Sequence, residues 1–281
     1  MNAIPDMEGR LLLLGAGRMG SAMLGGWLAS GLPAERIIVL DPAPSEDIRR
    51  LVNDAGAVLN PPAEELGDIS VLVAAVKPQV MDEALSEIAP ALSAGGTPLI
   101  LSIAAGRTIA SFKRHFGEDA PVIRAMPNTP AAIGEGITGF AASPEVSEAQ
   151  KDMARALLAA LGEVVEVADE TLIDAVTAVS GSGPAYVFLL TECLAEAGAR
   201  QGLPRELAAR LAQATVSGAG ALLKASEEEP AALRRAVTSP GGTTAAALEV
   251  LMDDRQGLCR LMDRAVAAAV RRSRELAGGK D

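Results

Sequence analysis

The chain has 281 residues, of which 49% are apolar and 22% are charged. This composition excludes an intrinsically disordered protein, which needs low hydrophobicity and high charge. The 36 acidic residues outnumber the 25 basic ones, and aromatic residues make up only 2% of the chain. An acidic protein repels nucleic acid, and so few aromatic side chains cannot build base-stacking surfaces. We therefore expect no nucleic-acid partner, and the length predicts two domains or one large one.

Cysteine and histidine are too rare for most metal or thiol chemistry. The two cysteines, Cys193 and Cys259, stand in Ala/Leu-rich helical sequence, and we expect them to be buried small hydrophobic residues. The single histidine, His115, follows Lys113 and Arg114 at what reads as the polar end of a helix. One histidine cannot supply a zinc site or a multi-histidine catalytic centre. The sequence therefore predicts chemistry without metal, thiol or imidazole.

The apolar run at residues 11–14 resembles the start of a signal peptide. However, Asp6 and Glu8 precede it, Arg18 interrupts it, and no small-residue cleavage site follows. No apolar run reaches the roughly 18 residues that a membrane-spanning helix needs. The sequence predicts a cytoplasmic protein with no membrane partner.

Residues 1–168 alternate short strand-like runs with amphipathic helical stretches. We expect strands at 10–14, 36–40, 69–76, 97–103, 121–125 and 136–142, and helices at 21–30, 45–55, 79–92 and 144–161. Runs such as 71–76 are apolar throughout, which is typical of a parallel sheet buried on both faces. The alternation predicts an α/β fold with a doubly wound, Rossmann-like sheet that binds a dinucleotide.

Residues 169–281 contain no strand-like run, so the sequence predicts an all-α second domain that follows without a flexible linker. Helices are expected at 185–201, 205–225, 231–237, 244–252 and 256–276. Pro184, Pro204 and Pro230 stand where first helical turns should begin. The many alanines and glycines permit close helix approach, and we expect these helices to complete their core on a partner subunit.

A glycine motif, Gly15-Ala-Gly17-Arg18-Met19-Gly20, directly follows the first strand and opens a helix. In this setting the first glycine makes a tight turn, the second lets the backbone approach a pyrophosphate, and the third lets helix and strand pack closely. The helix N-terminus then faces the phosphate charge. The motif predicts dinucleotide binding, with a purely structural glycine turn as the alternative.

Asp41 ends the second strand, about 20 residues past the glycine motif, where an acid bonds the ribose 2′-hydroxyl of NAD. A 2′-phosphate would favour a nearby arginine, whereas Pro42 follows, and Arg49 and Arg50 lie further along. These residues favour NADH over NADPH. The alternative is that Asp41 simply starts a turn.

Two further segments follow strands and are expected to line the cofactor. One is Val76-Lys77-Pro78, at the end of the strand 69–76 and directly after it. Ligands bind at strand carboxyl ends in such sheets. Lys77 is a weaker candidate for a catalytic base. Asn128, between two prolines, is placed to bond an amide such as nicotinamide, with a structural turn as the alternative.

The most specific segment is Ser239-Pro-Gly241-Gly242-Thr243-Thr244, which precedes a helix. Two glycines and hydroxyl residues at a helix start form a compact anion site, and the N–H groups of Gly242, Thr243 and Thr244 are expected to hold a carboxylate. Capping explains one hydroxyl but not the whole run. We therefore expect a small-molecule substrate bearing a carboxylate.

At these motifs the chain resembles the pyrroline-5-carboxylate reductases, the enzymes of the last step of proline biosynthesis. The resemblance includes GAGRMG at 15–20, VKPQ at 76–79, SIAAG at 102–106, RAMPNTPA at 124–131, SGSGPAY at 180–186 and the signature region 238–253. The motifs stand in the order of the family and cover nearly the full length.

The resemblance implies an NAD(P)H-dependent oxidoreductase that transfers a hydride to the C5 imine carbon of 1-pyrroline-5-carboxylate and forms L-proline. We expect the backbone of residues 241–243, with Ser239, to anchor the substrate carboxylate, and the resemblance implies that the Thr244 hydroxyl bonds the ring nitrogen. The helical domain would form a homodimer, and such dimers often assemble into decamers. Many family members carry a basic residue where Pro42 stands, which puts the family's usual NADPH preference in doubt here.

Two other functions remain open at this point. A β-hydroxyacid-dehydrogenase-like enzyme would use a lysine of the helical half, which offers only Lys224 and Lys280. A dinucleotide-binding sensor without turnover would need no substrate anchor, and the intact run 239–244 argues against it.

Overall fold

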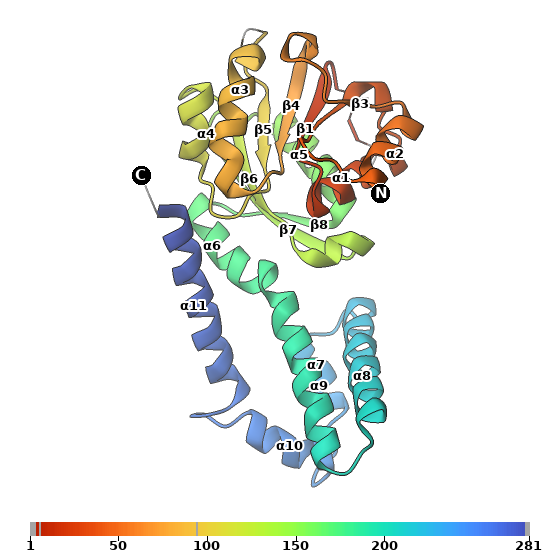
Figure 1. Ribbon diagram of the computed structural model, residues 1–281. Coiled ribbons are helices and arrows are strands. Elements are labelled where there is room, and N and C mark those ends of the chain that lie inside the picture. Colours follow the sequence, from red (N-terminus) through yellow and green to blue (C-terminus); the bar gives the residue numbers. More distant parts are fainter. Residues whose placement is uncertain (1–3, 6, 94, 279–281) are drawn as a thin grey trace. The chain divides into compact units, whose positions relative to one another are not determined.

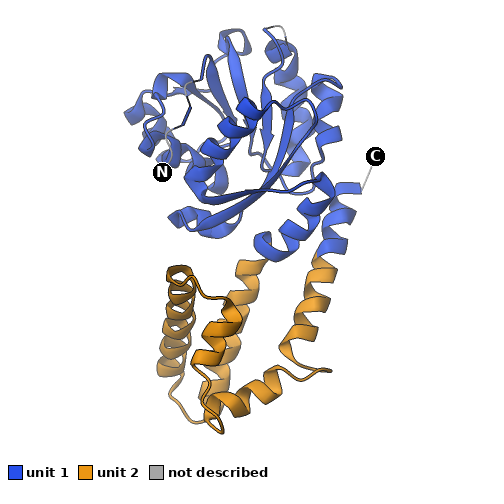
Figure 2. Cartoon of the chain, turned by 180° about the vertical axis from the view of Figure 1, so that it is seen from behind, with its two compact units in different colours: residues 1–181, 270–281 blue, residues 182–269 orange. Residues whose placement is uncertain are grey.

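The computed structural model describes residues 4–5, 7–93 and 95–278, which form two compact units (Figure 2). Unit 1 comprises residues 1–181 and 270–281, and unit 2 comprises residues 182–269. The chain therefore passes from one unit to the other twice. The sequence predicts the boundary between a dinucleotide-binding domain and a helical second domain after residue 168. That boundary stays a prediction.

Unit 1 is built on a sheet in the order β3-β2-β1-β4-β5-β6-β7-β8 (Figure 1). Its strands are β1 (Arg10–Leu14), β2 (Ile37–Leu40), β3 (Val58–Leu59), β4 (Ile69–Ala74), β5 (Leu99–Ser102), β6 (Val122–Met126), β7 (Gly136–Ala142) and β8 (Gly162–Glu166). Neighbouring strands are parallel except β6 and β7, which are antiparallel. The strand order runs outward in both directions from β1, so the predicted doubly wound sheet is confirmed.

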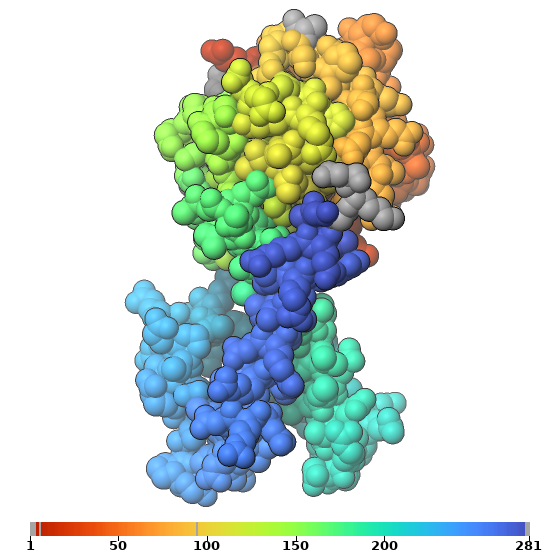
Figure 3. All heavy atoms as spheres, turned by 90° about the vertical axis from the view of Figure 1, so that its left-hand side faces the viewer, coloured from red at the N-terminus to blue at the C-terminus, as the bar shows by residue number. Residues whose placement is uncertain are grey.

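Helices cover both faces of this sheet. One face carries α1 (Arg18–Ala29), α2 (Glu46–Ala55) and α5 (Glu148–Leu158), and the other carries α3 (Met81–Ser93) and α4 (Ile109–Phe116). Helices α3 and α4 lie on the side of unit 1 that faces the viewer in Figure 3. Because successive strand side chains point to opposite faces, Leu11 and Leu13 pack into the first core and Leu12 and Leu14 into the second.

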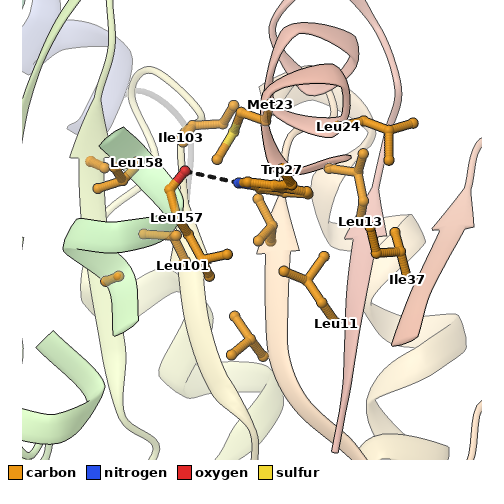
Figure 4. Packing of buried hydrophobic residues seen from close by; sticks show 14 of the residues in the cluster. Leu11, Leu13, Met23, Leu24, Trp27, Ile37, Leu101, Ile103, Leu157 and Leu158 are labelled. Atoms are coloured by element: carbon orange, nitrogen blue, oxygen red, sulfur yellow. Dashed lines mark hydrogen bonds between the residues drawn. The ribbon is translucent and has the colours of Figure 1, made fainter. Parts of the chain in front are cut away.

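Trp27 fixes α1 against the first core. Its side chain is fully buried, and its indole Nε1 donates a hydrogen bond of 2.8 Å to the carbonyl of Leu157 in α5 (Figure 4). A buried tryptophan gives a large apolar contact, provided that its N–H finds an acceptor. The orientation of α1, and hence of its N-terminus, is set by this contact.

Three elements of unit 1 differ from the sequence prediction. The two-residue strand β3 and the strand β8 were not predicted, and β8 directly follows the helix expected at 144–161. Helix α4 was expected only at its end, where His115 does lie in the last turn. Strand β8 was missed because Gly162–Glu166 has little apolar content and gains its partner only through pairing with β7.

Unit 2 is helical. It contains α7 (Gly183–Arg200), α8 (Arg205–Ala225), α9 (Pro230–Ala236), α10 (Thr243–Leu251) and the first part of α11 (Leu258–Gly278), as expected. A short helix α6 (Ile173–Val176) and a π-helical turn (Thr177–Gly181) precede α7 and belong to unit 1.

Helix α7 exposes an apolar surface. It buries none of its residues within this chain, and its exposed side chains include Val187, Phe188, Leu189, Leu190 and Leu194. In the described part of the chain, one helical stretch, Glu170–Arg200, is long and apolar enough to cross a membrane by length and composition, which is weak evidence for a span. A contiguous apolar patch of this kind more often marks a protein interface.

The expected burial of both cysteines is wrong for the single chain. Cys193 on α7 and Cys259 on α11 are exposed. Both helices bury little of their surface within the chain, so a small apolar side chain on them has no core to enter.

Candidate active site

The glycine motif has the geometry that phosphate binding requires. Gly15 adopts a left-handed φ of +94°, and a Cβ on it would lie 2.9 Å from the backbone nitrogen of Val76. A Cβ on Gly20 would lie 2.2 Å from the carbonyl oxygen of Gly15, so α1 packs directly on the loop. Around Gly17, by contrast, no described atom lies within 4 Å of a built Cβ. The first and third glycines are thus required by the chain itself, and the second is open to a ligand.

Helix α1 presents its N-terminus beside this open position. Its N-cap is Gly17, no side chain caps it, and its first turn carries no acidic residue among those described. Uncapped N–H groups and the helix dipole favour a bound anion. Arg18 and Met19 form the start of this turn, so the predicted pyrophosphate contact fits the geometry.

Asp41 braces the glycine loop. Its carboxylate accepts hydrogen bonds from the backbone N–H of Ala16 at 2.8 Å and of Ala43 at 2.9 Å. The turn that the sequence left as an alternative is therefore present. Each carboxylate oxygen of Asp41 keeps a second lone pair that can accept a hydrogen bond from a ribose hydroxyl. This contact is therefore compatible with the turn and stays a prediction.

Asn60 is a site residue that the sequence reading missed. Its side chain exchanges two hydrogen bonds of 2.8 Å with the backbone of Asp41. It also has a φ of +49°, in the left-handed region that asparagine tolerates better than most residues. An asparagine directly before Pro61 and Pro62 is a turn signal that could have drawn attention to it.

A cavity of about 410 Å³ lies at this edge of the sheet. Its lining residues are Leu14, Leu40, Asp41, Pro42, Asn60, Val76, Val80, Glu83, Ala84, Glu87 and Ile88. They come from the ends of β1 and β2, from the segments after β2, β3 and β4, and from α3. The strand order reverses between β1 and β4, which is where ligands bind in doubly wound sheets. Apolar walls with a few polar groups suit an adenosine moiety.

The other predicted cofactor residues lie at neighbouring strand ends in unit 1. Lys77 is exposed and precedes a short 3-10 turn that begins at Pro78. Asn128 is buried, and its side-chain oxygen accepts a hydrogen bond of 3.0 Å from the N–H of Ile137. Asn128 therefore has a structural role, and its contact with a nicotinamide amide stays a prediction.

A second cavity of about 500 Å³ in unit 1 lies beyond Pro78 and Gln79, against α4 and the end of α11. Arg107 lines it and binds Asp82 through both guanidinium nitrogens. This hydrogen bonding, together with that from His115, lowers the pKa of Asp82 to about 2, although partial burial opposes the shift. The Arg107 guanidinium is thus already paired with a carboxylate of the chain.

The predicted substrate residues form the start of α10 in unit 2. Gly241 has a φ of +68°, and the N–H of Gly242 donates a hydrogen bond of 3.0 Å to the carbonyl of Ser239, which closes a tight turn. The Gly242 N–H, which the sequence predicts to hold a carboxylate, is thus already engaged within the chain, and the N–H groups of Thr243 and Thr244 remain for that role. Gly242 is the N-cap of α10, and no side chain in the described chain caps the helix. Thr243 is exposed and Thr244 half-buried. None of the hydroxyls of Ser239, Thr243 and Thr244 caps the helix. The N-terminus of α10 is therefore open, which is the arrangement expected of an anion site.

The doubly wound sheet, the glycine loop and the adenosine-sized cavity define a dinucleotide-binding fold. Residues 10–106 match the family described as NADP oxidoreductase, coenzyme F420-dependent, and residues 170–276 match the pyrroline-5-carboxylate reductase dimerisation family.

Similar proteins share most of the chain. A pyrroline-5-carboxylate reductase from Pseudomonas aeruginosa is 44% identical over 95% of this chain and 97% of its own length. One from Arabidopsis thaliana is 38% identical over 97% of each chain. The structure of one from Coxiella burnetii matches with a TM-score of 0.88 and 34% identity, over 96% of this chain and 99% of that one. The chain belongs to the pyrroline-5-carboxylate reductase family.

Proposed function

We propose that this chain catalyses the reduction of 1-pyrroline-5-carboxylate to L-proline with NAD(P)H, as its family membership implies. The observation that carries the proposal is the start of α10, which no described side chain caps and at which Gly241, Gly242 and three hydroxyl residues stand together. A carboxylate is the group that such a site favours. This anchor also argues against a dinucleotide sensor without turnover.

The cofactor site fits NAD(P)H. Gly17 is open to a pyrophosphate, and the cavity beside Asp41 has the size for an adenosine. When bound, the reduced nicotinamide supplies a hydride. The chain's glycine loop, α1 N-terminus and Asp41 hold and orient the dinucleotide, and Val76–Pro78 and Asn128 extend this surface along neighbouring strand ends.

The chain needs no histidine or metal for this reaction. A protonated cyclic imine is already a strong electrophile at C5, and as C5 gains the hydride, the C=N π electrons become the nitrogen lone pair. Holding the reactants in place lowers the barrier by roughly 7–11 kcal/mol in well-oriented systems. Ser239 and the backbone of Gly241 and Thr243 anchor the carboxylate, while the Gly242 N–H is held by the Ser239 carbonyl. The Thr244 hydroxyl bonds the ring nitrogen and steadies its proton.

The cofactor preference that we propose is for NADH. Pro42 stands where a basic residue would hold the 2′-phosphate of NADPH. Arg50 lies on α2 and is engaged with Glu46 at 3.3 Å on an exposed surface. A relative from Plasmodium falciparum, 30% identical, has a structure with NADP bound, so both cofactors must be compared directly.

The oligomer that we propose is a homodimer formed through the helical region, with further assembly to a decamer. The exposed apolar side chains of α7 support this, because isolated patches of this kind are costly in water. Subunit contact also accounts for the apolar stretch Glu170–Arg200 without a membrane. A cytoplasmic location is consistent with a biosynthetic enzyme of this family.

The direct test is the initial rate of NADH and NADPH oxidation by the purified protein with 1-pyrroline-5-carboxylate, with proline measured as the product. Proline formation with a higher kcat/KM for NADH supports both the reaction and the preference. Folded protein that binds a dinucleotide but forms no proline would mean that the substrate is wrong.

A further inference from the structure

The cavity of about 410 Å³ beside Asp41 is also lined by acidic residues of α3. Glu83 and Glu87 stand one turn apart on α3 and line the same cavity as Asp41. The lining contains no lysine or arginine. Neither glutamate has a hydrogen bond or an ion pair to any described residue, and both are exposed. The cavity therefore carries three carboxylates without a compensating cation in its lining.

The size of the cavity brings these charges close to any ligand inside it. A volume of 410 Å³ corresponds to a sphere about 9 Å across, which is near the Debye length of roughly 8 Å at physiological ionic strength. A phosphomonoester carries a charge of about −1.5 to −2 at neutral pH. A 2′-phosphate in this cavity would thus be repelled by both glutamates, whereas a ribose hydroxyl would not.

We propose that Glu83 and Glu87 select the cofactor by electrostatic exclusion of the 2′-phosphate of NADP(H). The inference deepens the proposed function, on which it rests, because it assigns the preference for NADH to two residues of α3. Sequence spacing after β2 does not reveal them, since they reach the cavity from a helix more than 40 residues away along the chain.

Substituting the two glutamates tests the effect of charge alone, whereas substituting Asp41 does not. Replacing Asp41 removes the acceptor for two backbone N–H groups and disturbs the glycine loop together with the charge. Glu83→Gln with Glu87→Gln keeps side-chain size and removes two charges that bond nothing else among the described residues. The matched control is Glu118→Gln with Asp119→Asn, two exposed acids of unit 1 that do not line the cavity.

The experiment is isothermal titration of the full-length protein with ADP-ribose and with 2′-phospho-ADP-ribose, at two ionic strengths. Two unit charges about 9 Å from a phosphate predict that the double variant binds the phosphorylated ligand about tenfold more tightly at 0.01 M ionic strength, and about threefold at 0.15 M. The affinity for ADP-ribose should change much less. The control variant should leave the ratio of the two dissociation constants within about twofold of the parent.

An unchanged ratio in the double variant, or an equal change for both ligands, would overturn the proposal. A gain in the control as large as in the double variant would also overturn it, because net charge alone would then explain the effect. Circular dichroism and the thermal midpoint establish that each variant is folded. Because the ligands are cofactor fragments, this result stands apart from the substrate assay: absent proline formation contradicts the proposed reaction, and an unchanged ratio contradicts only the role of the glutamates.

Discussion

Ser273 Oγ on α11 donates a hydrogen bond of 2.7 Å to Asp174 Oδ1 on α6, across 99 residues of chain. Both side chains are buried. Arg124 of β6, 5% exposed, lies between Glu170 at 3.0 Å and Asp174 at 3.7 Å. The last part of α11 that the structure describes is thus joined to α6 and β6 of unit 1 through a buried polar cluster.

Removing Asp174 should lower the stability of unit 1. Asp174→Ala leaves the Ser273 hydroxyl without its acceptor and Arg124 with Glu170 as its remaining acidic partner, and an unsatisfied buried group costs about 1–3 kcal/mol. Urea unfolding measures the change. Glu275→Ala, which removes an exposed partner of Arg272, should change stability by less than about 0.5 kcal/mol. Equal effects of the two variants would contradict the role of the cluster.

Gly20→Ala should weaken dinucleotide binding, because the new methyl group would lie 2.2 Å from the Gly15 carbonyl and push α1 off the loop. We expect a loss of stability of about 1–3 kcal/mol from this overpacking, and a loss of NADH affinity measured by fluorescence titration. Gly25→Ala is the control on the same helix, where no described atom lies within 4 Å of the new carbon. That variant should gain up to about 1 kcal/mol.

Thr244→Ala should lower kcat/KM by about five- to 150-fold, equivalent to about 1–3 kcal/mol of transition-state stabilisation. The reason is that the proton on the ring nitrogen loses its partner. Thr244→Ser, which keeps the hydroxyl, should recover most of the activity. Steady-state rates over substrate concentration provide the measurement, and unchanged kcat and KM in the alanine variant would exclude this role.

The lowered pKa of Asp82 predicts that the folded protein loses stability in acid. Hydrogen bonding from Arg107 holds its pKa at about 2 in the folded protein, below the usual 3.8. The stabilising contribution is therefore complete above about pH 4 and disappears as the pH falls toward 2. In urea unfolding between pH 2 and 6, Asp82→Asn should show a shallower decline than the parent. Asp119→Asn, at an exposed position, serves as the comparison, and parallel curves for parent and Asp82→Asn would contradict the prediction.

Phe188→Glu should dissociate the oligomer. Phe188 is 61% exposed on α7 in the single chain, and a charge buried in a subunit contact is strongly unfavourable. Light scattering after gel filtration should show a shift to the monomer mass. Glu192→Gln on the same helix should keep the parent's mass. A parent protein that is monomeric at micromolar concentration would refute the proposed homodimer.

The sequence was most informative where local chemistry decides the structure. Strands β1 and β7 have the predicted ends, because apolar runs bounded by turn residues define them. Gly15 and Gly20 could be assigned roles because each needs a close backbone approach that only glycine permits.

Features that depend on distant partners were not predictable in the same way. Strand β8 exists through its pairing with β7, and Asn60 enters the site through the backbone of Asp41. Glu83 and Glu87 reach the cavity only once α3 is packed on the sheet. The cysteines were misjudged because a helical apolar pattern does not distinguish a chain's own core from a surface awaiting a second chain.

The hydrogen bonds from Ala16 and Ala43 to Asp41 bear on the energetics of ligand capture. They hold the loop in the arrangement that the structure shows, so the conformational entropy of ordering these residues is lost during folding and not again when a dinucleotide binds. Fixing one residue costs about 1–2 kcal/mol, and a preorganised loop keeps that amount available as affinity. Asp41 would therefore strengthen binding of every dinucleotide, whichever ribose it carries.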